Sequence, residues 1–207
     1  PLYLKPLKLG FDMSFTSATK YFSGHSDAMG GSLAVNKKLF KKVMFFYKLS
    51  GYRMSADEAY LIIRGLRTLD VRLKKHYENT KIVINFLKKQ KKIKEILYPY
   101  KPGSKNYKLW KKYYSGANGL FSIVIKSKNK SSVVKFVNSL ELFGIGYSWG
   151  GFESLVLLQN LRGETKYTRI RKYFRFEKDE HIVRLHIGLE DPKDLIEDLR
   201  KALTYIK

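Results

Sequence analysis

Alternation of apolar and polar residues near the start of the chain predicts β-structure. Phe11 to Phe15 alternates at the strand period, and Ser32 to Val35 has the composition of a short buried strand. Lys37 to Leu49 then carries apolar residues at helical spacing and stops before Gly51, which fits an amphipathic helix or a tight connection. We therefore expect residues 1–35 to form strands and loops, with a helix after them.

A helix start signal follows. Ser55 and Glu58 have the spacing of a capping box, in which the hydroxyl accepts from a first-turn amide and the carboxylate reaches back. Apolar residues then recur at helical spacing as far as Leu87, with Gly65 inside the run. Because glycine costs a helix about 1 kcal/mol relative to alanine, we expect Gly65 to mark a bend or a close helix contact. We place a domain boundary there, after residue 66.

The second half of the chain predicts a small α/β domain. Tyr98-Pro99 and Pro102-Gly103 indicate a long loop, and Leu155 to Leu161 is a short apolar stretch. Strands are predicted at Leu120 to Ile125, Phe143 to Trp149 and His181 to Ile187, and helices at Ser132 to Leu142 and from Asp191-Pro192 onward. This order is typical of helices packed against an open sheet.

Composition excludes several kinds of chemistry. The chain has no cysteine, which rules out disulfides, thiol catalysis and thiolate metal sites. Its histidines show no metal-type pairing with carboxylates, so no metal is predicted. No apolar run approaches the roughly 20 residues of a membrane span. We expect a soluble, cytoplasmic protein without membrane contact.

The formal net charge of +23 invites a nucleic-acid interpretation, with basic clusters such as Lys88 to Lys94 on phosphates. However, the lysines are spread along the whole chain and accompany abundant Ile, Asn, Tyr and Phe, a mixture that AT-rich coding produces by itself. No nucleic-acid-binding motif accompanies the charge. We rank compositional bias first and keep nucleic-acid binding as a lower-ranked alternative.

One lysine has unusual neighbours. Lys20 lies between the small residues Ser17-Ala-Thr19 and a Gly-His-Ser-Asp turn instead of among other lysines. A lysine can act as a Schiff-base nucleophile where its surroundings favour the neutral amine. The alternative, favoured by local chemistry alone, is a Ser/Thr-capped turn with a solvated lysine.

Two further segments stand apart from the core pattern. Ser148 to Ser154 contains two adjacent glycines, which either permit a close backbone approach to a ligand or form a hairpin turn. Trp149 precedes them and either contacts a ligand or packs in the core. Arg184 is a charge inside an apolar strand. If buried, it needs an anion, and its fork-shaped guanidinium suits a carboxylate. The alternatives are a solvent-facing side chain or pairing with Glu190 or Asp191.

Three ordered motifs carry a resemblance to a known family. The runs Thr19 to Asp27, Ser148 to Leu155 and Val183 to Asp191 resemble cystathionine β-lyases, which belong to the pyridoxal-phosphate (PLP) enzymes of Cys/Met metabolism. The stretches Arg64 to Leu69 and Pro102 to Lys105 also resemble sequences of this family. The resemblance covers essentially the whole chain.

The resemblance implies an α/β fold, the C-terminal part of the type I PLP-dependent transferase (aspartate aminotransferase-like) fold. Residues 1–66 would be the end of the large PLP-binding domain and residues 67–207 the small C-terminal domain. The family's pyridine-nitrogen aspartate, ring-stacking tyrosine and phosphate loop would lie upstream of Pro1. We therefore expect this chain alone to bind the cofactor poorly and to be inactive, whereas the complete enzyme would be a homotetramer.

The resemblance also assigns roles around the cofactor, pyridoxal 5′-phosphate. Lys20 matches the lysine that forms the Schiff base and later shuttles the α-proton of the substrate. Ser17 and Thr19 match hydroxyl residues that contact the cofactor phosphate.

On the substrate side, Arg184 matches the arginine that binds the α-carboxylate, and Ser148 and Trp149 match the loop beside it. The implied reaction is the cleavage of cystathionine to homocysteine, pyruvate and ammonia, a transsulfuration step used in methionine biosynthesis. Trp149 before the two glycines favours the β-lyase over the γ-synthase and γ-lyase branches, which remain alternatives.

Overall fold

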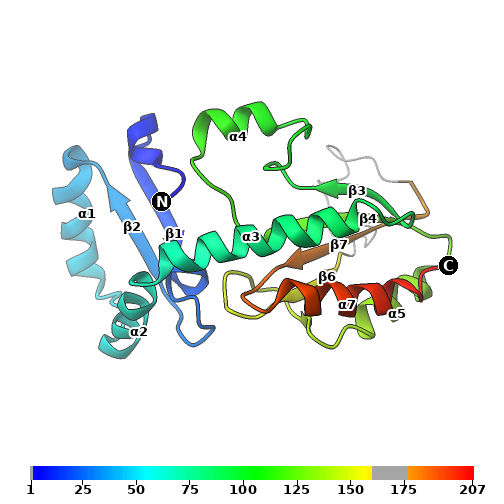
Figure 1. Ribbon diagram of the computed structural model, residues 1–207. Coiled ribbons are helices and arrows are strands. Elements are labelled where there is room, and N and C mark those ends of the chain that lie inside the picture. The colour runs from blue at the N-terminus through cyan, green and yellow to red at the C-terminus, as the bar shows by residue number, and fades with distance from the viewer. Residues whose placement is uncertain (1, 160–176) are drawn as a thin grey trace.

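The computed structural model describes residues 2–159 and 177–207 and contains two sheets. A two-stranded sheet with helices α1 and α2 lies at one end of the molecule, and a five-stranded sheet lies at the other (Figure 1). The long helix α3 (Leu69–Leu87) runs from the first part onto the second. The segments near Lys20 and near Arg184 meet between the two sheets, so the architecture itself positions the candidate site.

The first sheet pairs β1 (Met13–Ser17) with β2 (Gly31–Val35) in antiparallel register. Both predicted strands are therefore confirmed, but the predicted burial of the second is wrong. Leu33 is 49% exposed and its register partner Phe15 is 73% exposed. These apolar side chains therefore remain largely at the surface.

Helices α1 (Lys37–Ser50) and α2 (Ala56–Leu66) follow. Gly51 ends α1 in a left-handed conformation with φ of 69°, as its position predicts. The Glu58 amide donates to Ser55 Oγ at 3.2 Å, which confirms the predicted N-cap of α2. The Glu58 carboxylate accepts from the Ser55 hydroxyl at 3.1 Å. Local capping chemistry was thus sufficient to place the start of this helix.

The single long helical pattern is two helices, because α2 ends at Leu66 and α3 begins at Leu69. Gly65 marks a close contact, as expected. A Cβ at this position would lie 2.2 Å from the carbonyl oxygen of Ser23 and 2.3 Å from that of Phe22. Helix α2 therefore packs directly against the backbone that follows Lys20.

The second sheet has the strand order β3-β4-β7-β6-β5, with only β5 and β6 parallel. Its strands are β3 (Ile93–Leu97), β4 (Leu120–Lys126), β5 (Gly144–Ile145), β6 (Leu155–Leu158) and β7 (Glu180–His186). The three predicted strands are confirmed as β4, β5 and β7, although β5 is much shorter than predicted. The apolar stretch at 155–161 forms β6, and residues 160 and 161 lie outside the described residues.

Two elements were not predicted. Strand β3 begins inside the lysine-rich run 88–94, whose charge concealed the alternation. Helix α4 (Tyr107–Tyr113) follows the predicted loop. Helix α5 (Lys130–Asn138) ends before the predicted Leu142. The amides of Glu141 and Leu142 instead donate to the Asp198 carboxylate at 3.0 and 2.9 Å. The residues after α5 thus bond to Asp198 on α7 instead of continuing the helix.

Helix α7 (Pro192–Leu203) begins as predicted, with the Lys193 amide donating to the Asp191 carboxylate at 2.8 Å. Helices α3, α5 and α7 share one core cluster with alternate residues of the sheet, among them Ile123, Val183 and Leu185. Because side chains alternate along a strand, Arg184 lies on the face of β7 opposite this core. Among the described residues, no helix is long and apolar enough to cross a membrane.

Candidate active site

Lys20 lies in a tight turn between β1 and β2. The residues Ala18–Phe22 form one π-helical turn, η2, closed by hydrogen bonds from the Ser23 amide to the Ala18 carbonyl and from the Gly24 amide to the Lys20 carbonyl, both at 2.9 Å. Lys20 itself departs from helical geometry, with φ of −91° and ψ of −124°. The turn is anchored by Ala18, which is 1% exposed. The lysine side chain thus projects from a backbone that is fixed on both sides.

The amine of Lys20 is held by a loop far away in sequence. Its Nζ donates to Ser148 Oγ at 2.9 Å and lies 4.7 Å from the centre of the Trp149 ring. In the part of the chain that the structure describes, Lys20 forms no ion pair. The amine is therefore oriented by a hydroxyl and an aromatic face instead of being neutralised, which does not fit the alternative of a simply solvated lysine.

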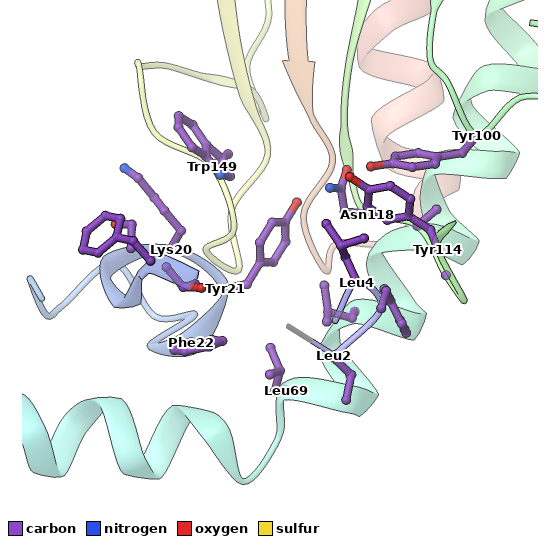
Figure 2. Close-up of a pocket in the computed structure, with 17 residues that line it drawn as sticks. Leu2, Leu4, Lys20, Tyr21, Phe22, Leu69, Tyr100, Tyr114, Asn118 and Trp149 are labelled. Atoms are coloured by element: carbon purple, nitrogen blue, oxygen red, sulfur yellow. The ribbon is translucent and has the colours of Figure 1, made fainter. Parts of the chain in front are cut away.

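A cleft of about 360 Å³ opens beside this lysine (Figure 2). Lys20 and Trp149 lie near one end of it, Tyr21 lies in the middle, and Tyr100 and Tyr114 lie at the other end. Clefts of roughly 300–1,000 Å³ with apolar walls and few polar groups are typical of small-molecule sites. Among the described residues that line it, Lys20 carries the only ammonium group.

The two predicted phosphate-binding hydroxyls differ in their surroundings. Ser17 lines the same cleft as Lys20. Thr19 Oγ1 accepts from the Gly30 amide at 2.9 Å, lies 3.4 Å from the Gly30 carbonyl, and lines a separate hollow. To bind a phosphate, Thr19 would redirect its hydroxyl hydrogen away from that carbonyl, whereas Ser17 already faces the cleft.

Gly150 brings the Ser148–Trp149 loop onto the lysine turn. It has φ of +83°, and a Cβ there would lie 2.7 Å from the amide nitrogen of Tyr21. The close approach expected for this glycine is therefore made to the backbone beside Lys20. Since no other residue type combines this conformation with this proximity, glycine is required here for the contact between the two segments.

Arg184 reaches the same loop from β7. Its Nη2 donates to the carbonyl oxygens of Gly146 at 3.1 Å and Ser148 at 3.3 Å, and its guanidinium carbon lies 5.7 Å from the centre of the Trp149 ring. Partial burial lowers the pKa of Arg184. A desolvated guanidinium bound only to carbonyls retains donors for an anion.

Arg184 does not pair with Glu190 or Asp191, the acids that the sequence offered as partners, and its side chain is partly exposed. Glu190 accepts from the amide and hydroxyl of Ser154 at 2.6 and 2.9 Å, and Asp191 caps α7. Within the described ranges, no ion pair involves Arg184. No carboxylate among these residues therefore occupies the position that an anionic ligand would take.

Sequence analysis missed a buried ring cluster behind the cleft, formed by Tyr21, His76 and His186. Ring centres lie 5.6 Å apart for Tyr21–His76, 6.0 Å for Tyr21–His186 and 5.1 Å for His76–His186. Burial lowers the pKa of His76 to about 4 and that of His186 to about 3. The available signal was the spacing of His186 two residues after Arg184, which places both on one face of β7.

Comparison with known proteins gives the family. The protein-family model described as "Cys/Met metabolism PLP-dependent enzyme" matches residues 1–204. The chain belongs to this family. As predicted, the family's cofactor is pyridoxal phosphate, which its description names.

Individual relatives differ in their named reactions. The chain is 40% identical over 203 residues to cystathionine beta-lyase MetC of Escherichia coli (strain K12), covering 98% of this chain and 51% of the relative. It is 38% identical over 205 residues to the L-alanine/L-glutamate racemase of Wolbachia pipientis wMel, covering 99% and 50%. The chain spans about half the length of the curated relatives it matches.

Solved structures agree on the fold. Cystathionine gamma synthase from Xanthomonas oryzae pv. oryzae matches with a TM-score of 0.88 and 30% identity, covering 99% of this chain and 53% of that one. Cystathionine gamma-lyase from Lactobacillus plantarum matches with a TM-score of 0.87 and 28% identity, covering 100% and 54%. The predicted fold, the C-terminal part of the PLP-dependent transferase fold, is thus confirmed.

The described residues fit this cofactor. An aldehyde requires an amine, which Lys20 offers at the edge of the cleft, and a phosphate requires donors such as the Ser17 hydroxyl. Among the described residues, no group of three or more His, Cys, Asp or Glu side chains is placed to hold a metal ion.

Proposed function

We propose that this chain carries the lysine and substrate-binding loop of a PLP-dependent carbon–sulfur β-lyase that cleaves cystathionine to homocysteine, pyruvate and ammonia. The observation that carries the proposal is the placement of the Lys20 amine, 2.9 Å from Ser148 Oγ and 4.7 Å from the Trp149 ring, beside a cleft. The second support is the identity of 40% to a named cystathionine beta-lyase.

In this proposal Lys20 holds the cofactor through its amine, and Ser17 and Thr19 contact its phosphate. Bound pyridoxal phosphate supplies an electron sink for the substrate's α-carbon. Ser17 is the better placed of the two hydroxyl residues because it shares the cleft with Lys20, while Thr19 first has to turn from Gly30.

Lys20 also moves the α-proton of the substrate. A general base works only within hydrogen-bond reach of the proton that it removes. The hydroxyl of Ser148 accepts from the Lys20 amine and so limits the directions in which Nζ can point. The Trp149 ring, whose centre lies 4.7 Å from Nζ, further limits where the amine can lie.

Arg184 binds the substrate's α-carboxylate. Its Nη2 is bound to the Gly146 and Ser148 carbonyls, which orients the plane of the guanidinium without neutralising it. The hydrogens on Nε and Nη1 remain as donors to a carboxylate. Because the same loop contacts both Arg184 and Lys20, a substrate bound to the arginine is brought close to the lysine.

A second candidate, an amino-acid racemase, is favoured by the 38% identity to the Wolbachia enzyme. It uses the same lysine as a proton-transfer group without carbon–sulfur cleavage. The γ-lyase and γ-synthase reactions are a third possibility, since relatives and solved structures bear those names. Trp149 beside the amine is the feature on which we base the choice of the β-lyase.

Because this chain alone is expected to be inactive, the experiment uses the complete enzyme that contains it and compares that enzyme with its Lys20→Ala variant, with pyridoxal phosphate present. We expect cystathionine to yield pyruvate with the unmodified protein, and the variant to lose both this activity and the cofactor's visible absorbance while its far-ultraviolet circular dichroism is unchanged. Conversion of L-alanine to D-alanine without pyruvate would instead identify the racemase. Release of 2-oxobutanoate would identify the γ-lyase.

Three expectations from the sequence remain proposals. We propose a homotetramer as the assembly, the cytoplasm as the location, and residue 66 as the boundary between the large-domain and small-domain parts. The helix break between Leu66 and Leu69 is compatible with that boundary. Nucleic-acid binding remains the lower-ranked alternative, and its test is a salt-sensitive affinity for RNA.

A further inference from the structure

We propose that His186 is a positioning residue that holds the Ser148–Trp149–Gly150 loop against Lys20 by accepting the Gly150 amide hydrogen on its neutral Nε2. The inference rests on the proposed function, because it explains how Lys20 and the substrate-binding Arg184 are held in position relative to each other. It assigns a purpose to a buried histidine that the proposed chemistry does not use directly.

The first step is the protonation state of His186. Its Nε2 lies 2.9 Å from the Gly150 amide nitrogen and 3.3 Å from the Gly151 carbonyl oxygen. One ring nitrogen cannot accept from the amide and donate to the carbonyl at once. The amide can only donate, and its contact is the shorter, so Nε2 carries the lone pair and Nδ1 carries the hydrogen.

The second step is what keeps the ring neutral. His186 is 1% exposed and its ring centre lies 5.1 Å from that of His76, which is 0% exposed. The Nδ1 of His76 lies 2.7 Å from the Ile187 carbonyl, an acceptor, and therefore donates to it. Burial lowers the pKa of both histidines, so His186 keeps its acceptor throughout the neutral range.

The third step is the geometry of β7. Arg184 and His186 are two residues apart and lie on the same face of the strand. Arg184 binds the loop at Gly146 and Ser148, and His186 binds it at Gly150. The loop is thus attached to β7 at both ends, and the stretch between the attachments carries the side chains that contact Lys20.

The last step connects His186 to the lysine turn. The ring of Tyr21, the residue next to Lys20, lies 6.0 Å from that of His186. Gly150 lies against the Tyr21 backbone, where a Cβ would come within 2.7 Å of the amide nitrogen. Releasing the Gly150 amide therefore loosens the contact that places Ser148 and Trp149 beside the lysine amine.

Two amide side chains make a matched test. In His186→Gln the longer side chain can bring a carbonyl oxygen to the former position of Nε2, whereas in His186→Asn it ends near the former Nδ1. Amide hydrogen exchange of ¹⁵N-glycine-labelled protein without cofactor reports on Gly150 directly. We expect about tenfold faster exchange at Gly150 in the Asn variant and near-normal exchange in the Gln variant.

Steady-state kinetics of the complete enzyme that contains this chain, with cofactor bound, should follow the same order. We expect kcat/KM for cystathionine to fall about tenfold with His186→Asn and to recover in His186→Gln. Unchanged Gly150 exchange in the Asn variant, or equal defects in both variants, would overturn the positioning role while leaving the lyase proposal intact. Failure of cofactor to bind at Lys20 would refute the lyase proposal itself, and the positioning role with it, even if exchange behaved as expected.

Unmodified protein supplies a measurement that does not depend on the folding of either variant. Its Gly150 amide should exchange more slowly than that of Gly151, for which the described residues offer no hydrogen-bond acceptor. Equal exchange of the two amides would contradict the proposal.

Discussion

The amine of Lys20 lies 2.9 Å from the hydroxyl of Ser148, although 128 residues separate them in the chain. The contact joins the turn after β1 to the loop before β6, and Trp149 covers the same amine at 4.7 Å. A short-range pattern cannot produce such a pairing, because each segment alone reads as an ordinary turn. The candidate site is therefore a property of the packing of the two sheets.

The Ser148 hydroxyl should matter more for turnover than for folding. Ser148→Ala removes the acceptor that orients Lys20, and we expect kcat to fall about tenfold with a stability change below about 1 kcal/mol. Ser139→Ala is the matched control, since its hydroxyl bonds only to the Phe136 carbonyl at the end of α5. Kinetics with cystathionine and thermal melts of both variants check the prediction. An unaltered kcat in Ser148→Ala would contradict it.

Gly51 is required for its backbone conformation alone, whereas Gly150 is required for its conformation and for a close contact. Both have positive φ, +83° and +69°, but only Gly150 has backbone within Cβ contact, whereas Gly51 has nothing within 4 Å. We expect Gly51→Ala to cost about 1 kcal/mol of unfolding free energy from conformation alone. Gly150→Ala should cost about 3 kcal/mol, because strain and overpacking add. Urea unfolding checks this, and equal costs would contradict the close contact.

Gly65 offers a prediction whose sign opposes helix propensity. By propensity, Gly65→Ala should stabilise α2 by about 1 kcal/mol. Instead, the new Cβ would lie 2.2 Å from the Ser23 carbonyl oxygen. We therefore expect a loss of about 2 kcal/mol or more, measured by chemical denaturation. A stabilised variant would mean that α2 does not pack against the lysine turn.

The histidine pair predicts a pH dependence of stability. Folding lowers the pKa of His76 from 6.5 to about 4 and that of His186 from 6.5 to about 3. Below about pH 6.5 the unfolded chain therefore binds protons that the folded protein does not. Stability is fully present above that pH and falls by up to about 1.4 kcal/mol per pH unit for each histidine, levelling off below the folded pKa values.

Denaturation curves between pH 7 and 4 check this dependence, and His186→Gln should remove about half of the histidine contribution. Comparing the protein with its variant cancels the titration of carboxylates common to both. His25→Gln, at an exposed position, serves as the control. An identical pH dependence in the protein and His186→Gln would show that His186 is not held neutral by burial.

Local chemistry in the sequence predicted much of the fold. The caps at Ser55 and Asp191, the stop at Gly51 and the close contact at Gly65 depend on one residue and its immediate neighbours, and all are present. The strand predictions succeeded where β-branched residues cluster, as in β4. Features decided by distant partners were not predictable, including the early end of α5 at the Asp198 carboxylate.

The site shows the same division. The unusual flanks of Lys20 drew attention to it, but its contact with Ser148 required the fold. Local pattern left Arg184 open between an anion, a neighbouring acid and solvent, because its carbonyl partners lie 38 and 36 residues away in the chain. The role of His186 was not predicted, because a single histidine in a strand gives no indication that its ring nitrogen accepts from the amide of Gly150.

The central claim, that Lys20 is the residue to which the cofactor attaches, has a direct test. The complete enzyme that contains this chain is incubated with pyridoxal phosphate, reduced with borohydride so that the attachment becomes permanent, digested, and mapped by mass spectrometry. The chain contains 31 lysines, so incidental labelling is measured in parallel with Lys20→Ala. We predict that the modification concentrates on the peptide containing Lys20 and that Lys20→Ala loses it. Modification spread evenly over surface lysines, or concentrated on another lysine, would contradict the account.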